Sequence, residues 1–357
     1  MGSGPGRPAY EGVRRLLVVR DDRLGDLVLT LPAIDRLKCA YPEAAIGLLV
    51  QPALAPLASL FPAVDRVVAT VAAIRDFAPD AAVCISRRPA AAWALRRAGV
   101  RRVTGTGRRI FSFLFDRTVP GSRRAATRHE LEHAIDLATC AGAVPGPIRF
   151  PIEVPDDAQA RVTQWLDANE IAADPLVIHP GTAGSCPGWP AARWCRLAHE
   201  LRKAEYPVVI TEGPADRLAM REFTHENFPR FAQGLPELAA LLGRARLVVS
   251  NSTGPIHLAN ALGTSTLAIH APWKSCGVER WGPYGAEGWA LVVGQPGARR
   301  WSRRQRGRRA RDLMDRLDVG TVFEAVHSML ATGRPQIRKL RGSSPDAWTP
   351  TDPGVHY

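Results

Sequence analysis

Four short segments of the chain combine turn-forming glycines with side chains that can accept, donate or transfer protons. They are residues 23–26 (RLGD), 179–185 (HPGTAGS), 211–217 (TEGPADR) and 251–257 (NSTGPIH). Each lies directly after a short apolar run that predicts a buried strand of a parallel sheet. Because such sheets bind ligands beyond the carboxyl ends of their strands, these segments are the candidate functional loops.

The first segment places an acidic side chain at the beginning of a predicted helix. Gly25 allows the backbone to turn tightly, and Asp26 falls near the first turn of the helix expected over residues 27–40. An aspartate in this position is often present only because it offsets the helix dipole. A dinucleotide site is not indicated, because no GxGxxG sequence stands between the strand and the helix.

The second and fourth segments are suited to bind phosphate. Thr182 lies among small residues with free amides, although the Walker sequence GxxxxGK[ST] is absent. Ser252 or Thr253 can cap the next helix while Pro255 occupies its first turn, so the positive helix end is open to a diphosphate. His257 falls on the same turn, where a single histidine is more often structural than functional.

The third segment carries an acidic residue after a predicted strand. Asp216 begins a helix expected over residues 216–223. An acidic side chain near this place often binds a ribose hydroxyl, and it equally often caps the start of a helix. The two interpretations of Asp216 therefore have equal weight.

The elements that must position these loops form two Rossmann-like halves. Apolar runs alternate with helical patterns from residue 15 onward, which is the order of a parallel α/β sheet with right-handed crossovers. Four prolines between residues 145 and 157 interrupt the pattern, which then restarts. We expect a flexible N-terminus over 1–14, a first domain over 15–150, a linker over 151–157, a second domain over 158–331 and a flexible tail over 332–357.

Composition excludes several classes of protein. The chain has 357 residues, of which 46% are hydrophobic and 23% charged, so it is too long for one ordinary core and too apolar to be mainly disordered. No apolar run reaches the roughly 18 residues that a membrane span needs, and the N-terminus lacks the pattern of a secretory signal. The six cysteines are scattered, which predicts neither a disulfide nor a zinc site and favours a reducing, cytoplasmic location.

The positive charge is concentrated in one stretch. Eight of the thirteen residues from Arg299 to Arg311 are arginines, in a chain whose net charge is +13. Such a run is most often a disordered, solvated segment, and it also suits non-specific RNA binding. Contact with an anionic membrane surface is slightly favoured here, on the condition that the substrate lies at a membrane. The rest of the chain is not basic enough to predict a specific nucleic-acid partner.

Several segments together resemble glycosyltransferase family 9, the ADP-heptose:lipopolysaccharide heptosyltransferases and their relatives. The resemblance extends from Arg15 to about Leu330. Its main segments are residues 16–50 (LLVVRDDRLGDLVLTLPAIDRLKCAYPEAAIGLLV), 178–182 (IHPGT), 188–190 (GWP), 235–272 (LPELAALLGRARLVVSNSTGPIHLANALGTSTLAIHAP) and 280–285 (RWGPYG), with a shorter element at 127–130 (TRHE). The first and the fourth are long and stand in the family's order.

The resemblance implies a fold, a reaction and a set of site residues. The fold would be GT-B, with two Rossmann-like domains whose parallel sheets face a cleft. The reaction would be an inverting, metal-independent sugar transfer, with no cofactor, from a nucleotide sugar to a lipopolysaccharide or lipid-linked glycan acceptor at the inner face of the inner membrane. By the match of motifs, Asp26 would be the general base and Asp216 would lie near the nucleoside. The donor phosphates would contact Thr182, Ser252, Thr253, Gly254 and His257, and the acceptor side would include Arg23, Gly25 and His129.

Two departures from the family's pattern bear on the donor. The family usually has a lysine just before its Trp-Pro pair, where this chain has Cys186, Pro187 and Gly188. It often has an aspartate where this chain has Ser252. Loss of one cation beside a diphosphate would cost about 1–3 kcal/mol unless another group replaces it, and the candidates are Arg193, Lys274 and Arg280.

Three alternatives to a heptosyltransferase follow from these departures. The first is a family member that uses a different nucleotide sugar. The second is an epimerase of the same fold, which would need further acid and base groups in the cleft. The third is a degenerate, non-catalytic module that binds a sugar nucleotide, although retention of Asp26 argues against it.

Overall fold

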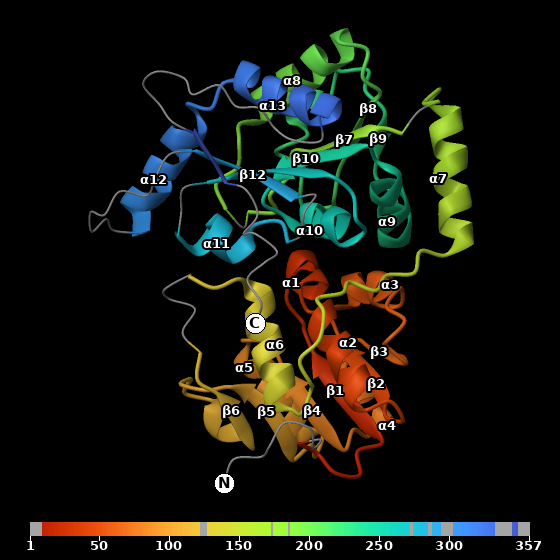
Figure 1. Ribbon diagram of the computed structural model, residues 1–357, viewed down its shortest axis with the longest axis vertical. Coiled ribbons are helices and arrows are strands. Elements are labelled where there is room, and N and C mark those ends of the chain that lie inside the picture. The colour runs from red at the N-terminus through yellow and green to blue at the C-terminus, as the bar shows by residue number, and fades with distance from the viewer. Residues whose placement is uncertain are drawn as a thin grey trace. The chain divides into compact units, whose positions relative to one another are not determined.

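The structure is a computed structural model with two compact units, Met1–Pro155 and Asp156–Tyr357. It describes residues 9–121, 127–172, 174–184, 186–271, 274–284, 288–293, 303–332 and 345–348. Each unit is an α/β structure of its own (Figure 1). The division falls inside the segment expected as a linker, and helix α7 (Asp156–Ala168) begins two residues before the expected start of the second domain.

Unit 1 is built on a six-stranded sheet in the order β3-β2-β1-β4-β5-β6. Its strands are β1 (Arg15–Val19), β2 (Ala45–Leu49), β3 (Arg66–Val68), β4 (Ala81–Cys84), β5 (Arg102–Thr106) and β6 (Arg117–Val119). All pairings are parallel. The strand order reverses between β1 and β4, and the carboxyl ends at such a point form the ligand crevice of a doubly wound sheet.

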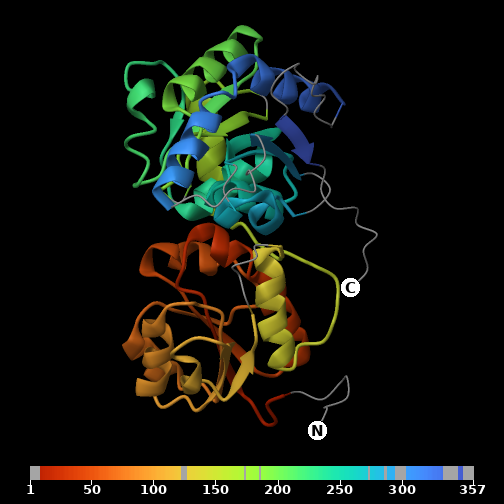
Figure 2. The same ribbon diagram turned by 90° about the vertical axis from the view of Figure 1, so that its left-hand side faces the viewer.

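Helices cover both faces of this sheet because its central strands are apolar on both sides. They are α1 (Leu24–Val28), α2 (Leu31–Ala40), α3 (Ala55–Ala58), α4 (Val71–Phe77), α5 (Pro89–Arg97) and α6 (Glu130–Cys140), with 3-10 turns at Pro52–Leu54 and Ser112–Leu114. Side chains 16–19 of β1 are fully buried, as expected for a strand that is covered twice. Helices α4 and α5 pack on the face that carries Leu17 and Val19, and α2 and α6 pack together on the other (Figure 2).

The described part of the N-terminal segment is packed rather than loose. Tyr10 is 2% exposed, and its hydroxyl lies 2.6 Å from Oγ1 of Thr104. The guanidinium groups of Arg102 and Arg117 lie over its ring. The expectation of a flexible segment over residues 1–14 is therefore wrong for residues 9–14, and residues 1–8 lie outside the described ranges.

Unit 2 repeats the same topology and adds one antiparallel strand. Its strands are β7 (Leu176–His179), β8 (Val208–Thr211), β9 (Arg230–Phe231), β10 (Leu247–Asn251), β11 (Thr266–His270), β12 (Gly288–Val293) and β13 (Pro345–Trp348), in the order β13-β12-β11-β10-β7-β8-β9. The six strands other than β13 pair in parallel, and β13 runs antiparallel to β12. Here the order reverses between β7 and β10.

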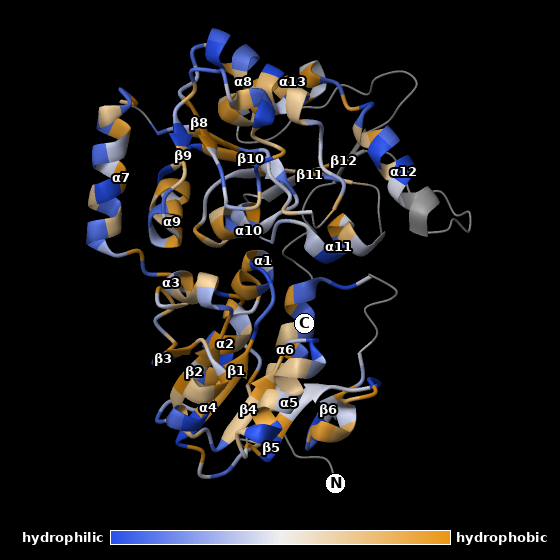
Figure 3. Cartoon of the chain, turned by 180° about the vertical axis from the view of Figure 1, so that it is seen from behind, coloured by the Kyte–Doolittle hydropathy of each residue, from blue (hydrophilic) through white to orange (hydrophobic). Residues whose placement is uncertain are grey.

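Two layers of helices enclose the second sheet. Besides α7 they are α8 (Ala191–Lys203), α9 (Leu235–Arg244), α10 (Gly254–Ala261), α11 (Val278–Trp281), α12 (Arg303–Met314) and α13 (Val319–Thr332), with 3-10 turns at Arg221–Phe223 and Lys274–Cys276. Helices α8 and α13 share one apolar core, while α7 packs against α9. Coloured by hydropathy, the strands are apolar and α12 is strongly polar (Figure 3). Within the described ranges no helix is both long and apolar enough to cross a membrane.

Three expectations for unit 2 are wrong. The helix expected over residues 216–223 is a turn followed by a 3-10 turn, because the carboxylate of Asp216 accepts from the amide of Gly213 and closes the chain on itself. The basic stretch is helical from Arg303 onward rather than disordered, and residues 299–302 lie outside the described ranges. The tail expected to be loose contains β13.

Candidate functional site

Unit 1 places a buried guanidinium among three carboxylates at its switch point, where the strand order reverses between β1 and β4. Arg20, directly after β1, is 1% exposed. Its Nη2 donates to Oδ1 of Asp26 and lies 3.3 Å from Oε1 of Glu130, while its Nε lies 3.5 Å from Oδ2 of Asp22. We call Arg20 and these three acids the Arg20 cluster. Its members come from residues up to 110 positions apart in the chain.

Burial and charge act in opposite directions within the Arg20 cluster. Burial alone lowers the pKa of Arg20, but the carboxylates of Asp26, Asp22 and Glu130 raise it above its ordinary value. Burial raises the pKa of Asp22 in spite of the guanidinium beside it. The cluster therefore keeps a permanent cation whose role is to hold several negative charges in place.

Asp26 is the member of this cluster best suited to proton transfer. Its side chain is 20% exposed, close to the 23% of Asp22, whereas that of Glu130 is 2% exposed. Arg20 holds Oδ1 of Asp26, and no donor among the described residues is bonded to Oδ2. A carboxylate that is oriented through one oxygen and open at the other can accept a proton from a bound hydroxyl group.

The loop after β4 completes the edge of the switch point. Ser86 donates through Oγ to Oδ1 of Asp21, and Nη1 of Arg88 lies 3.5 Å from Oδ2 of the same carboxylate. Because Asp21 directly precedes Asp22, these contacts tie the loop after β4 to the loop after β1. The backbone that carries Asp26 is thus supported from both sides of the crevice.

The acceptor-side residues named from the sequence have different surroundings. Arg23 is exposed at the N-cap position of α1, and Gly25 is buried within that helix. His129 is 8% exposed and caps α6, since its Nδ1 accepts from the amide of Leu131 at 3.3 Å. Arg20 and Glu130 were not predicted as site residues, although an arginine at the end of a fully apolar strand was a usable signal.

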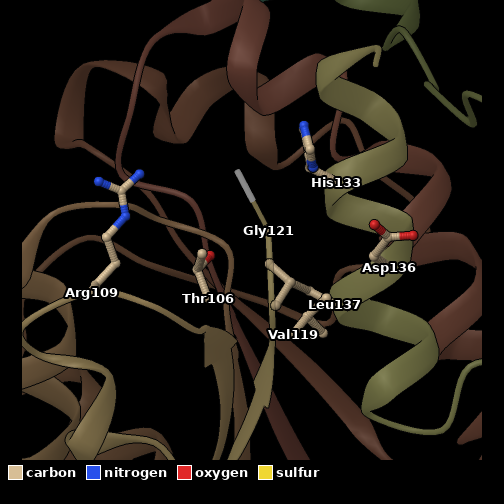
Figure 4. Close-up of a pocket in the computed structure, with 7 residues that line it drawn as sticks. All are labelled: Thr106, Arg109, Val119, Gly121, His133, Asp136 and Leu137. Atoms are coloured by element: carbon tan, nitrogen blue, oxygen red, sulfur yellow. The ribbon is translucent and has the colours of Figure 1, made fainter. Parts of the chain in front are cut away.

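A pocket lies at the carboxyl ends of β5 and β6 in the same unit. Figure 4 shows its lining side chains, which come from the strand ends, the following loops and helix α6. They are Thr106, Arg109, Val119, Gly121, His133, Asp136 and Leu137. Asp136 is already paired with Arg128 at 2.7 Å. Arg109 is the permanently charged cation that lines the pocket, and His133 lines it from α6.

In unit 2, Asn251 joins the two candidate phosphate loops. Its Nδ2 donates to the carbonyl of Pro180 at 3.0 Å, and its Oδ1 accepts from the amide of Trp189 at 2.9 Å. Asn251 ends β10, while the two partners belong to the loop between β7 and α8. The loops after β7 and β10 therefore lie side by side at the second switch point.

The loop after β7 is folded tightly around Thr182. The amide of Gly184 donates to Oγ1 of Thr182 at 3.3 Å, and Ala183 and Gly184 both have positive φ, at 45° and 68°. A Cβ at Gly188 would lie 2.6 Å from Cγ2 of Thr182. Glycine at position 188 thus allows the two arms of the loop to approach, and it keeps Thr182 next to Asn251.

Helix α10 begins without a side-chain cap. Thr253 occupies the N-cap position and Pro255 the first turn, as expected, but the hydroxyl of Thr253 bonds instead to the carbonyl of Asn251 and to Oγ of Ser250. Ser252 and Gly254 are half-buried beside it. The first amides of α10 therefore receive no acceptor from the N-cap side chain, and they can bind an anion.

Comparison with known proteins agrees with this arrangement. Residues 80–305 match the sequence pattern described as glycosyltransferase family 9 (heptosyltransferase). That match covers more than half of the chain. The chain belongs to glycosyltransferase family 9.

Individual relatives support the assignment of this glycosyltransferase to family 9. Lipopolysaccharide heptosyltransferase 1 of Pseudomonas aeruginosa is 27% identical over 295 residues, which cover 72% of this chain and 79% of the relative. The structure of the ADP-heptose lipopolysaccharide heptosyltransferase II of Escherichia coli superposes with a TM-score of 0.73 at 19% identity, covering 89% and 99%. A family 9 glycosyltransferase from Veillonella parvula superposes with a TM-score of 0.75 at 18% identity, covering 89% and 97%. The expectation of a GT-B fold is confirmed.

Of the three candidates to replace the missing lysine, the structure excludes one. Arg193 donates to the carbonyls of Asp315 and Leu317 and fastens the connection between α12 and α13. Arg280 is 8% exposed, and its guanidinium lies 4.8 Å from the ring centre of Trp281. The side chain of Lys274 lies outside the described part of the chain.

Arg280 stands in the neighbourhood of the proposed phosphate site. The ring of Trp281 lies 6.1 Å from that of His257, which is 5% exposed on α10. Arg280 and His257 therefore flank one tryptophan from two different helices. This places a permanent cation near the helix that carries His257.

Asp216 is a buried carboxylate that supports two loops. It is 6% exposed, its Oδ2 accepts from the amide of Gly213 at 2.8 Å, and the same oxygen lies 3.6 Å from Nε2 of His179. A Cβ on Gly181 would fall 2.0 Å from its Oδ1, so glycine at 181 makes room for the carboxylate. The role expected near the nucleoside stays a prediction.

His179 makes stability depend on pH. Burial lowers the pKa of His179 below its ordinary value of 6.5, although Asp216 opposes the shift. As pH falls through 6.5, the unfolded chain takes up a proton that the folded chain does not. The free energy of unfolding then decreases, by at most about 1.4 kcal/mol per pH unit. Denaturant unfolding at pH 8, 7, 6 and 5 measures this slope.

The control for this prediction is an exposed histidine. His179→Gln removes the titrating group and should flatten the profile between pH 7 and 5, whereas His225→Gln should leave it unchanged. An unaltered slope in His179→Gln would show that another group causes the dependence.

A disulfide joins two loops of unit 2, contrary to the expectation from the sequence. Cys186, in the loop after β7, is bonded to Cys276, in the loop after β11, with their Cα atoms 6.3 Å apart. The two cysteines stand 90 positions apart, and no pattern in the sequence indicated that they would pair. Strands β7 and β11 both flank β10, and this brings the two loops together. The expectation that no cysteines pair is therefore wrong.

Removing this disulfide should lower stability measurably. A loop of this length restricts the unfolded chain, so Cys276→Ser should lose about 2–4 kcal/mol relative to the oxidised protein. Dithiothreitol should lower the unfolding midpoint of the wild type to that of the variant and leave the variant unchanged. Cys39→Ser, which removes an exposed free thiol, is the matched control. Equal midpoints of wild type and Cys276→Ser under oxidising conditions would contradict the bond.

One group of side chains in unit 2 has the composition of a metal site. Ligand atoms of Cys195, His199 and Glu226 lie within 4.8 Å of one another. However, Arg202 lies 3.2 Å from Nδ1 of His199, whose Nε2 lies 2.8 Å from Glu226. A guanidinium that donates to Nδ1 leaves the ring proton on Nε2, directed at the carboxylate. Burial also raises the pKa of the Cys195 thiol, so the group is better described as a hydrogen-bonded chain.

Proposed function

We propose that this protein transfers a sugar from a nucleotide sugar to a lipopolysaccharide core or a related surface glycan, with inversion, and that ADP-heptose is the donor. The observation that carries the proposal is the carboxylate of Asp26, which Arg20 holds at the switch point of unit 1. The heptosyltransferase relatives, whose names include lipopolysaccharide and ADP-heptose, support the choice of substrates.

In this proposal, Asp26 is the general base. Its Oδ2 takes the proton of the acceptor hydroxyl as that oxygen attacks the anomeric carbon. A new carbon–oxygen bond forms on one face of the sugar while the bond to the diphosphate breaks on the other, which inverts the configuration. The nucleoside diphosphate leaves with the electron pair of the broken bond.

The donor half stabilises the leaving group with its own residues. The uncapped amides of α10 and the hydroxyl groups of Thr182 and Ser252 would bind the diphosphate, and Arg280 would supply positive charge. Together these groups can replace the charge of a metal ion, so we predict activity without one. On the acceptor side, the pocket that contains Arg109 and His133 suits an anionic part of the acceptor.

Calorimetric titration in the absence of metal tests the donor. We expect ADP and ADP-heptose to bind, and UDP and GDP to bind at least about tenfold more weakly. If the protein prefers another nucleotide, the proposal of a glycosyltransferase stands and ADP-heptose is excluded as its donor. Absence of binding by every nucleotide would mark the donor site as degenerate.

A second candidate function is a module that binds a sugar nucleotide without catalysis. The absence of the family lysine, where Cys186 instead forms a disulfide, favours it. The Asp26→Asn variant described in the Discussion separates the two candidates.

The protein would act at the inner face of the inner membrane, where the proposed acceptor is held. The stretch from Arg299 to Arg311 was predicted to contact an anionic membrane. In its described part, Arg308, Arg309 and Arg311 are exposed on α12. Contact of this helix with lipid stays a prediction.

A further inference from the structure

Unit 1 carries three exposed, large apolar side chains on neighbouring segments. Ile110 is 98% exposed, Phe113 is 70% exposed and Trp93 is 45% exposed. Ile110 and Phe113 stand in the turn after β5, and the ring of Phe113 lies 6.3 Å from that of Trp93 on α5. We call these three residues the apolar tip. Large apolar groups that gather on a surface mark an interaction site.

The turn that carries the apolar tip is held rigidly. Oγ of Ser112 donates to the carbonyl of Thr106 at 2.8 Å and accepts from the amide of Arg109 at 2.9 Å. Nε of Arg96 donates to the carbonyl of Leu114 at 2.8 Å, which ties the turn to α5. These bonds leave Ile110 and Phe113 little opportunity to fold back onto the protein.

The same turn already supplies its own core side chains. Leu114 and Phe115 are buried in the apolar core of unit 1, and Phe111 packs against it. The ring of Phe115 occupies the space that a Cβ on Gly105 would fill, at 2.4 Å. Ile110 and Phe113 are therefore not displaced core residues, because the core beneath them is complete.

The segments that carry the apolar tip are strongly basic. Between Arg87 and Arg117 the chain has nine arginines and one acidic residue, Asp116, so this stretch carries +8 of the net +13. Arg97, Arg101, Arg108 and Arg109 are exposed. Exposed apolar side chains in a segment rich in arginine suit the head-group region of an acidic bilayer, which is anionic at its surface and apolar beneath it.

We propose that the apolar tip inserts into an anionic membrane while the arginines around it bind lipid phosphates. The aromatic rings of Trp93 and Phe113 suit the boundary between head groups and acyl chains. This surface offers both apolar and electrostatic attraction, and stable attachment needs two such signals. The described part of α12 exposes arginines without a large apolar side chain, and so offers charge alone. The proposal holds for any sugar donor, and its test uses neither donor nor acceptor.

Sedimentation with lipid vesicles tests the proposal. The full chain should bind vesicles of phosphatidylcholine mixed with phosphatidylglycerol and should not bind phosphatidylcholine alone. The double variant Ile110→Ser, Phe113→Ser should bind the mixed vesicles at least about tenfold more weakly, because each side chain loses its apolar contact. Leu218→Ser, at a position 78% exposed in unit 2, is the matched control and should bind as the wild type does.

The salt dependence of vesicle binding distinguishes electrostatic attraction from the insertion of apolar side chains. High salt should weaken wild-type binding only in part and abolish the remaining binding of the double variant. Arg97→Gln with Arg101→Gln should lower affinity at low salt. The unit 1 variants should keep wild-type circular dichroism and ADP affinity, because none of them alters unit 2. Leu218→Ser should keep both because its side chain is exposed.

Two results would overturn the proposal. One is a double variant that binds mixed vesicles as tightly as the wild type. If the triple variant Arg308→Gln, Arg309→Gln, Arg311→Gln then loses binding, α12 is the membrane contact. The other is a wild type that binds neither kind of vesicle but binds single-stranded RNA, since the arginines would then contact a nucleic acid.

Discussion

Replacing Asp26 with asparagine should lower turnover by at least about 100-fold and leave donor affinity unchanged. The amide of asparagine has the size of the carboxylate and still accepts a hydrogen bond from Arg20, so the Arg20 cluster keeps its shape. It cannot take the proton of the acceptor hydroxyl. Single-turnover transfer measures the chemical step, and calorimetry with ADP measures the donor site.

The matched control lies within the same cluster. Asp22→Asn removes a carboxylate from Arg20 and leaves the proposed base in place, so its turnover should fall far less than that of Asp26→Asn. Equal losses in the two variants would assign the effect to the charge of the cluster. Unchanged turnover in Asp26→Asn would exclude Asp26 as the general base. If the wild type binds the donor but transfers no sugar, the non-catalytic binding module is favoured.

Replacing Arg20 with methionine should lower the free energy of unfolding by about 3–5 kcal/mol. The guanidinium is 1% exposed and contacts three carboxylates. Methionine fills a similar volume but leaves these negative charges together without their cation. Denaturant unfolding measures the loss, and Arg14→Met, at an exposed position outside the cluster, should change stability by no more than about 0.5 kcal/mol.

The pH dependence of this loss distinguishes charge from packing. Without the guanidinium, repulsion favours protonation of the carboxylates in the folded state, so the variant gains stability relative to the wild type as pH falls. The difference between Arg20→Met and the wild type should therefore shrink between pH 8 and pH 5. A difference that stays constant over this range would assign the loss to packing alone.

Local patterns in the sequence predicted the elements and the chemistry of the candidate loops. The apolar run of β1, the helix-start pattern at Pro255 and the acidic residue at Asp26 depend on neighbours within a few positions, so they can be recognised without a fold. The alternation of strands and helices was sufficient to predict two Rossmann-like halves. The same local logic failed at Asp216, whose carboxylate bonds backward to Gly213 and prevents the helix that the pattern suggested.

The tertiary structure alone decided which distant residues meet. The pairing of Arg20 with Glu130 spans 110 positions, the contact of Asn251 with Pro180 spans 71, and the disulfide of Cys186 spans 90. None of these follows from spacing, because a parallel sheet places strand ends side by side in its spatial order rather than in chain order. The sequence by itself thus determined what chemistry each loop can do. The strand order, which reverses between β1 and β4 and between β7 and β10, decided which of those loops act together.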